Sequence, residues 1–155
     1  MNVTTASLLS GAHALEVGSY GGSAGIFVGL EGMLKFLSGL DVDMQSSVVE
    51  NVAGSASHSN LDGDFTTAEF ESVGRMKYDS SSDVLYLCDD KSSIIRIVDF
   101  STQQVSTMST SDNSAITFAH ASSVYPTYGQ GERFPGMDVD SGGAYLYVTD
   151  RLNVY

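Results

Sequence analysis

The sequence predicts an all-β fold, because its apolar residues fall in short runs that turn-forming residues separate. Such runs, rich in β-branched and aromatic residues and bounded by Gly, Ser, Asp or Asn, are residues 25–28, 84–88, 94–98 and 144–148. The chain also contains 16 glycines. Turn clusters about ten residues apart are typical of sandwiches, barrels and propellers. Residues 32–40 resemble a helix, but two glycines and a serine within them disfavour that structure.

An internal repeat refines the fold prediction. A shift of 61 positions places residues 76–79 (MKYD) on 137–140 (MDVD), and the same shift places 85–89 (LYLCD) on 146–150 (LYVTD). Two strand motifs in a single register indicate a repeat, and repeats of about 40 to 60 residues with several strands each are typical of β-propeller blades. A weaker copy begins at residues 25–29, which resemble the first of these strands at a shift of 50. We therefore expect four-stranded antiparallel sheets arranged as blades.

The repeated residues resemble the NHL repeat, a family of β-propellers. In that family a D-G and an A-x-F precede a G-I-x-V-D strand, and L-Y-V-A-D-x-x-N, I-R-x-I and V-S-T-L follow it. The matching segments are 62–63 (DG), 68–70 (AEF), 74–79 (GRMKYD), 85–89 (LYLCD), 95–97 (IRI) and 105–108 (VSTM). This copy has Ser92 at the asparagine position and Arg75 where a small residue is usual, whereas the last copy keeps the asparagine as Asn153. The resemblance covers residues 48–155 and implies a propeller.

The repeat divides the chain into four parts. We expect a degenerate first blade or N-terminal segment over residues 1–47 and an NHL-like blade over 48–108. An inserted loop or extra strand follows over 109–133, and residues 134–155 begin a further blade that is truncated. Propellers close with about four to eight blades. We therefore expect an incomplete propeller that takes further blades from a longer form of this chain or from another chain.

Charge and composition exclude several classes of protein. Seven Lys and Arg against 19 Asp and Glu give a formal net charge of −12. Such a chain is repelled by nucleic-acid phosphates and by anionic membrane surfaces. The most apolar stretch, residues 24–40, contains two charged residues and two glycines in its middle, so we predict no membrane span. The lone cysteine, Cys88, excludes an intramolecular disulfide.

Several repeated residues have structural explanations. Cys88 lies at an alternating position of a strand, which predicts a buried and unreactive thiol. Asp89 and Asp150 each follow a strand, where a carboxylate can accept backbone N–H bonds within the turn. Residues 18–25 are rich in glycine, and we predict a loop between strands there because no helix follows to cradle a phosphate.

One segment resembles a calcium-binding EF-hand loop. With His58 as position 1, the oxygen ligands at later positions would be Asn60, Asp62, Asp64 and Glu69. A histidine is a poor first ligand for a hard cation, and residues 54–57 (GSAS) cannot end a firm entering helix. The sequence therefore favours the repeat over a calcium site, and we predict no other cofactor.

The inserted segment 109–133 is the most function-like part of the sequence. Its aromatic residues Tyr125 and Tyr128 are candidates for binding a protein partner, because loops on a rigid scaffold commonly carry recognition residues. The alternative is that residues 116–118 add a strand to their own blade and that Pro126 forms a turn.

The predicted function is that of a non-enzymatic scaffold or protein-interaction module. The three histidines, His13, His58 and His120, lie in unrelated contexts, and no catalytic motif accompanies them. One alternative is an enzyme of the propeller class, similar to lyases or lactonases, whose catalytic residues lie outside this segment. Another is a structural component of an extracellular assembly. The composition, rich in Ser, Thr and Gly and poor in lysine, favours an extracellular or assembly-bound location.

Overall fold

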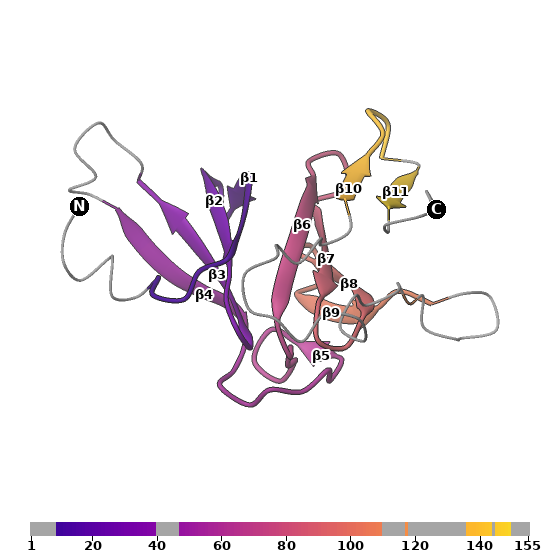
Figure 1. Cartoon of the computed structure of the whole chain (residues 1–155). Coiled ribbons are helices and arrows are strands. Elements are labelled where there is room, and N and C mark those ends of the chain that lie inside the picture. The colour runs from indigo at the N-terminus through magenta and orange to yellow at the C-terminus, as the bar shows by residue number, and fades with distance from the viewer. Residues whose placement is uncertain (1–8, 40–46, 110–116, 118–135, 144, 150–155) are drawn as a thin grey trace.

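The fold is all-β, as predicted (Figure 1). The computed structural model describes residues 9–39, 47–109, 117, 136–143 and 145–149. These residues form three antiparallel sheets. Within the described ranges no helix is long and apolar enough to cross a membrane.

The first sheet is a meander of four strands in chain order: β1 (Ala14–Tyr20), β2 (Ser23–Gly29), β3 (Met33–Ser38) and β4 (Val48–Gly54). The loop predicted at residues 18–25 is therefore mostly strand. Only Gly21 and Gly22 turn, both with positive φ, as two-residue hairpin loops require. Gly18 lies within β1. Only glycine fits at this position, because a Cβ there would collide with the rings of Phe27 and Tyr78.

The second sheet contains β6 (Val73–Asp79), β7 (Val84–Asp89), β8 (Ile94–Asp99) and β9 (Gln104–Thr107), again paired in chain order. A two-residue strand, β5 (Gly63–Asp64), adds to the free edge of β9. The structure places residues 48–54 in the first sheet, where β4 pairs with β3. The predicted boundary at residue 48 therefore differs from the boundary between the sheets, which falls after Gly54.

The third sheet pairs β10 (Gly136–Val139) with β11 (Leu146–Thr149) and repeats the hairpin of β6 and β7. The shift of 61 positions carries each of three cross-strand pairs onto its counterpart. These are Met76↔Leu87 onto Met137↔Val148, Lys77↔Tyr86 onto Asp138↔Tyr147, and Tyr78↔Leu85 onto Val139↔Leu146. The turns agree as well, because Asp79 accepts the N–H of Ser81 and Asp140 accepts the N–H of Gly142.

The first copy of the repeat is one strand out of the predicted frame. Residues 25–29 form the second strand of their sheet, and β1 precedes them. The predicted match of residues 25–29 to β6, at a shift of 50, is therefore wrong. By its place in the sheet, β2 corresponds to β7, and β1 corresponds to β6. The run of glycines hid β1, since glycine normally weakens a strand.

The sheets pack face to face through apolar clusters. Between the first and second sheets lie Phe27 and Phe36 on one side and Leu85, Leu87 and Val98 on the other. Between the second and third sheets lie Cys88, Ile95 and Val148. The three sheets meet at their edge strands β1, β6 and β10, since β6 contacts both β1 and β10 (Figure 1).

Candidate functional site

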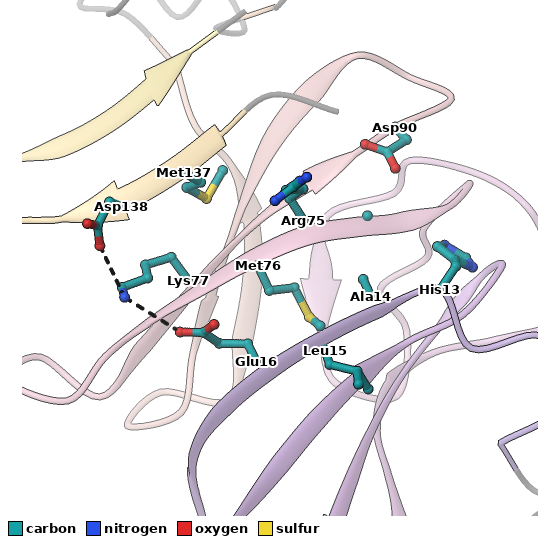
Figure 2. A pocket seen from close by; sticks show the side chains of 11 residues that line it. His13, Ala14, Leu15, Glu16, Arg75, Met76, Lys77, Asp90, Met137 and Asp138 are labelled. Atoms are coloured by element: carbon teal, nitrogen blue, oxygen red, sulfur yellow. Dashed lines mark ion pairs between the residues drawn. The ribbon is translucent and has the colours of Figure 1, made fainter. Parts of the chain in front are cut away.

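A cavity of about 410 Å³ lies where the strands β1, β6 and β10 of the three sheets meet (Figure 2). Its lining is unusually rich in charged side chains for a junction between sheets. The lining residues are His13, Ala14, Leu15, Glu16, Gly74, Arg75, Met76, Lys77, Asp90, Met137 and Asp138.

Lys77, on β6, forms ion pairs with residues of β1 and β10. Its Nζ lies 3.1 Å from Oδ1 of Asp138 on β10 and 3.9 Å from Oε1 of Glu16 on β1. The same Glu16 oxygen accepts the backbone N–H of Tyr78 at 3.1 Å. The hydrogen bond to Asp138 raises the pKa of Lys77, and Lys77 in turn lowers the pKa of Asp138. Because these side chains are partly exposed, water and salt weaken the pairs, which mainly orient the strands.

Arg75 enters the cavity from an irregularity in β6. The pairing of β6 with β7 shifts register between Val73 and Met76, so Gly74 and Arg75 form a bulge. Bulges re-aim side chains and are frequent near functional sites. Gly74 is required there, because a Cβ would collide with the carboxylate of Asp90. Arg75 is exposed, and among the residues that the structure describes it has no ion pair.

His13 closes the end of the cavity that lies near Arg75 and Asp90 (Figure 2). Its Nδ1 donates a hydrogen bond to the carbonyl of Gly11 at 3.1 Å. The hydroxyl of Ser72 lies 3.4 Å from its Nε2. The ring is thus held by one bond on each nitrogen. The cavity is lined by the cations of Arg75 and Lys77, by three carboxylates and by the imidazole of His13. Such a lining suits a small polar ligand or a polar side chain of a partner.

A second group of charges is centred on the fully buried Arg96 and Asp89 and holds the segment before β6. The guanidinium of Arg96 donates to the carbonyls of Glu69 (3.0 Å) and Leu61 (2.9 Å) and to Oδ1 of Asp62 (2.9 Å). It also lies 3.6 Å from Oδ2 of Asp89, and neither side chain is exposed. The Cζ of Arg96 lies 5.2 Å from the ring centre of Phe70, which is a cation–π contact.

Asp89 is structural, and it acts at longer range than the sequence predicted. Its carboxylate accepts the backbone N–H groups of Glu71 (3.0 Å) and Ser72 (2.9 Å), which lie far from its own turn. Burial raises the pKa of Asp89, although these two N–H groups and Arg96 partly oppose the rise. Asp150 lies outside the described residues.

The residues of the suggested calcium loop take part in local protein contacts. Asp62 binds Arg96 and also accepts the N–H and the hydroxyl of Thr107. Asp64 accepts hydrogen bonds from the residues that follow it, Thr66 and Thr67, and these lower its pKa. Glu69 accepts the hydroxyl of Ser55 at 3.4 Å, and Asn60 is exposed. Across the described ranges no three His, Cys, Asp or Glu side chains gather as a metal-binding group.

Of the other residues singled out in the sequence, Cys88 lies in the described part of the chain and the tyrosines of the inserted segment do not. Cys88 is buried, and burial raises the pKa of its thiol, in agreement with the predicted unreactive group. Tyr125 and Tyr128 lie outside the described residues, as does His120. Of the inserted segment, Thr117 forms an isolated β-bridge with Ile94, which supports added pairing beside β8.

The described residues define an all-β protein of antiparallel sheets, with one cavity lined by β1, β6 and β10. No known protein family and no curated protein matches the chain.

The cavity residues were not predicted as a site. Lys77 and Asp138 occupy the same repeat position, 61 residues apart. Their opposite charges at equivalent positions could have predicted an ion pair between the two copies. Arg75 departs from the NHL pattern, which was a second signal. His13 and Glu16 carried none, because β1 itself was hidden.

Proposed function

We propose that the chain forms blades of an NHL-type β-propeller that serves as a non-enzymatic scaffold for protein interaction. One observation carries the proposal: β1, β6 and β10, each an edge strand of its sheet, line a single cavity. In propellers the sheets surround a central channel in this manner. The 61-residue register of the strand pairs supports the same arrangement.

The use of charge in the cavity favours a scaffold over an enzyme. Lys77 forms ion pairs with Glu16 on β1 and with Asp138 on β10, so these three charges are engaged in orienting the strands. The buried Arg96 and Asp89 are likewise engaged with the backbone. A catalytic acid or base needs a free proton-transfer position facing a substrate.

The partner would bind through the inserted segment 109–133, whose Tyr125 and Tyr128 remain the predicted recognition residues. A net charge of −12 favours a partner with a basic surface. The test compares binding of a partner by the wild-type chain with binding by a Tyr125→Ala/Tyr128→Ala variant. Leu61→Ala, which truncates an exposed apolar side chain outside the segment, is the control. We expect at least a tenfold loss of affinity for the double variant only, and equal affinity in all three proteins would contradict the proposal.

Arg75 favours a second candidate, a propeller-class enzyme that binds an anionic substrate in the cavity. Because the propeller lyases and lactonases that this alternative resembles would place metal ligands around the central channel, elemental analysis of the purified protein separates it from the scaffold. The scaffold predicts no stoichiometric zinc or calcium, whereas one equivalent of either would support the enzyme.

A further inference from the structure

A second level of side chains lies beside the one that Lys77 and its two carboxylate partners form across the edge strands. Two residues before each member of that first level, and so on the same side of its strand, lie Ala14 in β1, Arg75 in β6 and Gly136 in β10. Figure 2 shows Arg75 and Lys77 together on the side of β6 that faces β10. The small residues on both neighbouring strands leave room beside the Arg75 guanidinium, and this room is part of the cavity.

Arg75 has no counter-ion in the part of the chain that the structure describes. The other cation of the cavity, Lys77, is held by Glu16 and Asp138. Arg75 is exposed, and a guanidinium presents pairs of parallel N–H groups that match the two oxygens of a carboxylate. Arg75 is therefore suited to bind the carboxylate of a ligand.

The lining as a whole does not favour a simple anion. It contains one more carboxylate than cations, since Asp90 adds to Glu16 and Asp138. At the first level, Lys77 balances only one of its two partners. Within the described residues, Oε2 of Glu16 and Oδ2 of Asp138 accept no hydrogen bond, whereas Lys77 and the backbone use the other oxygen of each. These two free oxygens can accept the N–H groups of an ammonium.

The spacing of the two levels suits a ligand that carries both charges close together. Residues two apart on a strand lie about 6.6 Å from each other, and charge-assisted hydrogen bonds are about 2.8 Å long. An α-amino acid has its carboxylate and its ammonium on one carbon atom, so it can reach both levels at once. The cavity volume of about 410 Å³ lies within the range of small-molecule sites. Apolar walls beside the charges come from Leu15, Met76 and Met137.

We propose that the cavity binds a free α-amino acid with an aliphatic side chain. Arg75 binds its carboxylate, Glu16 and Asp138 bind its ammonium, and the apolar walls contact its side chain. This small-molecule site goes beyond the proposed scaffold function, because it involves neither a protein partner nor the segment 109–133.

The test is isothermal titration calorimetry at pH 7 with three probes. L-leucine carries both charged groups, isopentylamine lacks the carboxylate, and 4-methylpentanoate lacks the ammonium. We expect L-leucine to bind at one site and each of the other probes to bind at least tenfold more weakly, because each loses one set of charge-assisted hydrogen bonds.

Two variants assign the two charged groups of the ligand. Arg75→Met should raise the dissociation constant of L-leucine at least tenfold and change that of isopentylamine less than twofold. Asp138→Asn should weaken L-leucine binding without weakening 4-methylpentanoate. Lys91→Met is the control, because it removes a cation that lies outside the cavity, and it should leave all three dissociation constants unchanged. Far-UV circular dichroism checks that every variant keeps its β structure.

Three results would each overturn the proposal. They are a folded wild-type protein that shows no saturable binding of L-leucine, equal affinity for L-leucine and 4-methylpentanoate, and L-leucine binding that survives Arg75→Met. Partner binding through residues 109–133 is measured separately. A folded protein that binds its partner but not L-leucine therefore refutes the amino-acid site and leaves the proposed function intact.

Discussion

Arg96→Met tests whether the buried charges hold the segment that leads into β6. The substitution keeps the length and apolar stem of the side chain but removes the guanidinium, and Asp89 is left buried without its cation. Breaking a buried ion pair in this way destabilises a protein by about 3–5 kcal/mol. The carbonyl of Glu69 loses the Arg96 donor at the same time, whereas that of Leu61 loses one of two donors and keeps the N–H of Glu69. We therefore expect a loss of about 3 kcal/mol or more in the free energy of unfolding.

Urea unfolding followed by far-UV circular dichroism measures this loss. With a urea dependence of about 1–3 kcal/mol/M, the midpoint should fall by about 1 M or more. Arg75→Met is the matched control, because it makes the same chemical change at an exposed arginine. It should change stability by no more than about 0.5 kcal/mol.

The pH dependence and a double variant sharpen the test. The pKa of Asp89 is already raised by burial, and loss of Arg96 raises it further. An acid with a raised folded pKa stabilises the fold at low pH and loses that contribution as pH rises through the folded value. The deficit of Arg96→Met should therefore grow as pH rises through the folded pKa of Asp89 in the wild-type protein, which lies above the ordinary Asp value of 3.8. Asp89→Asn added to Arg96→Met should recover part of the loss at neutral pH. A loss below about 1 kcal/mol, or one equal to that of Arg75→Met, would refute the reasoning.

Three further outcomes follow from the contacts. Cys88 is buried and burial raises its thiol pKa, so it should react with a thiol reagent only after denaturation; rapid labelling of the folded protein would contradict this. Lys77→Met should lower the melting temperature by no more than a few degrees, and the difference should vanish at high salt; a salt-independent drop would show that the pairs are shielded from solvent. Hydrogen bonds from Ser82 and Ser81 lower the pKa of Asp79, so its contribution is present above 3.8 and lost as pH falls through the lower folded value. Asp79→Asn should therefore be less stable than wild type at neutral pH but lose less stability on acidification, as urea midpoints across the acid range would show; parallel pH profiles would contradict this.

The sequence predicted best where local pattern and packing agree. Residues 84–88 and 94–98 alternate apolar side chains between turns, and the structure has strands there with nearly the same bounds. The 61-residue repeat was visible because both copies keep the same spacing between strand and turn, and the strand pairs follow that spacing.

The first strand and the buried charges were not predicted, for two different reasons. Gly18 in β1 makes room for aromatic rings, one of them from the second sheet, so its reason for being glycine lies far away in the sequence. Arg96 was recognised as part of a repeat motif, but its partners Leu61, Glu69 and Asp89 come from three other segments. A local sequence pattern cannot predict contacts that form only when the sheets pack together.

The placement of the positive charges alters how the protein would meet a charged molecule at a distance. Of the five described cations, Lys35 and Arg96 are buried, and Lys77 and Lys91 are paired with carboxylates, which leaves Arg75. Burial and pairing leave the net charge of −12 unchanged, so the long-range field is negative. Such a field accelerates the diffusional encounter with a basic partner, and the association rate should fall as ionic strength rises while the dissociation rate changes little.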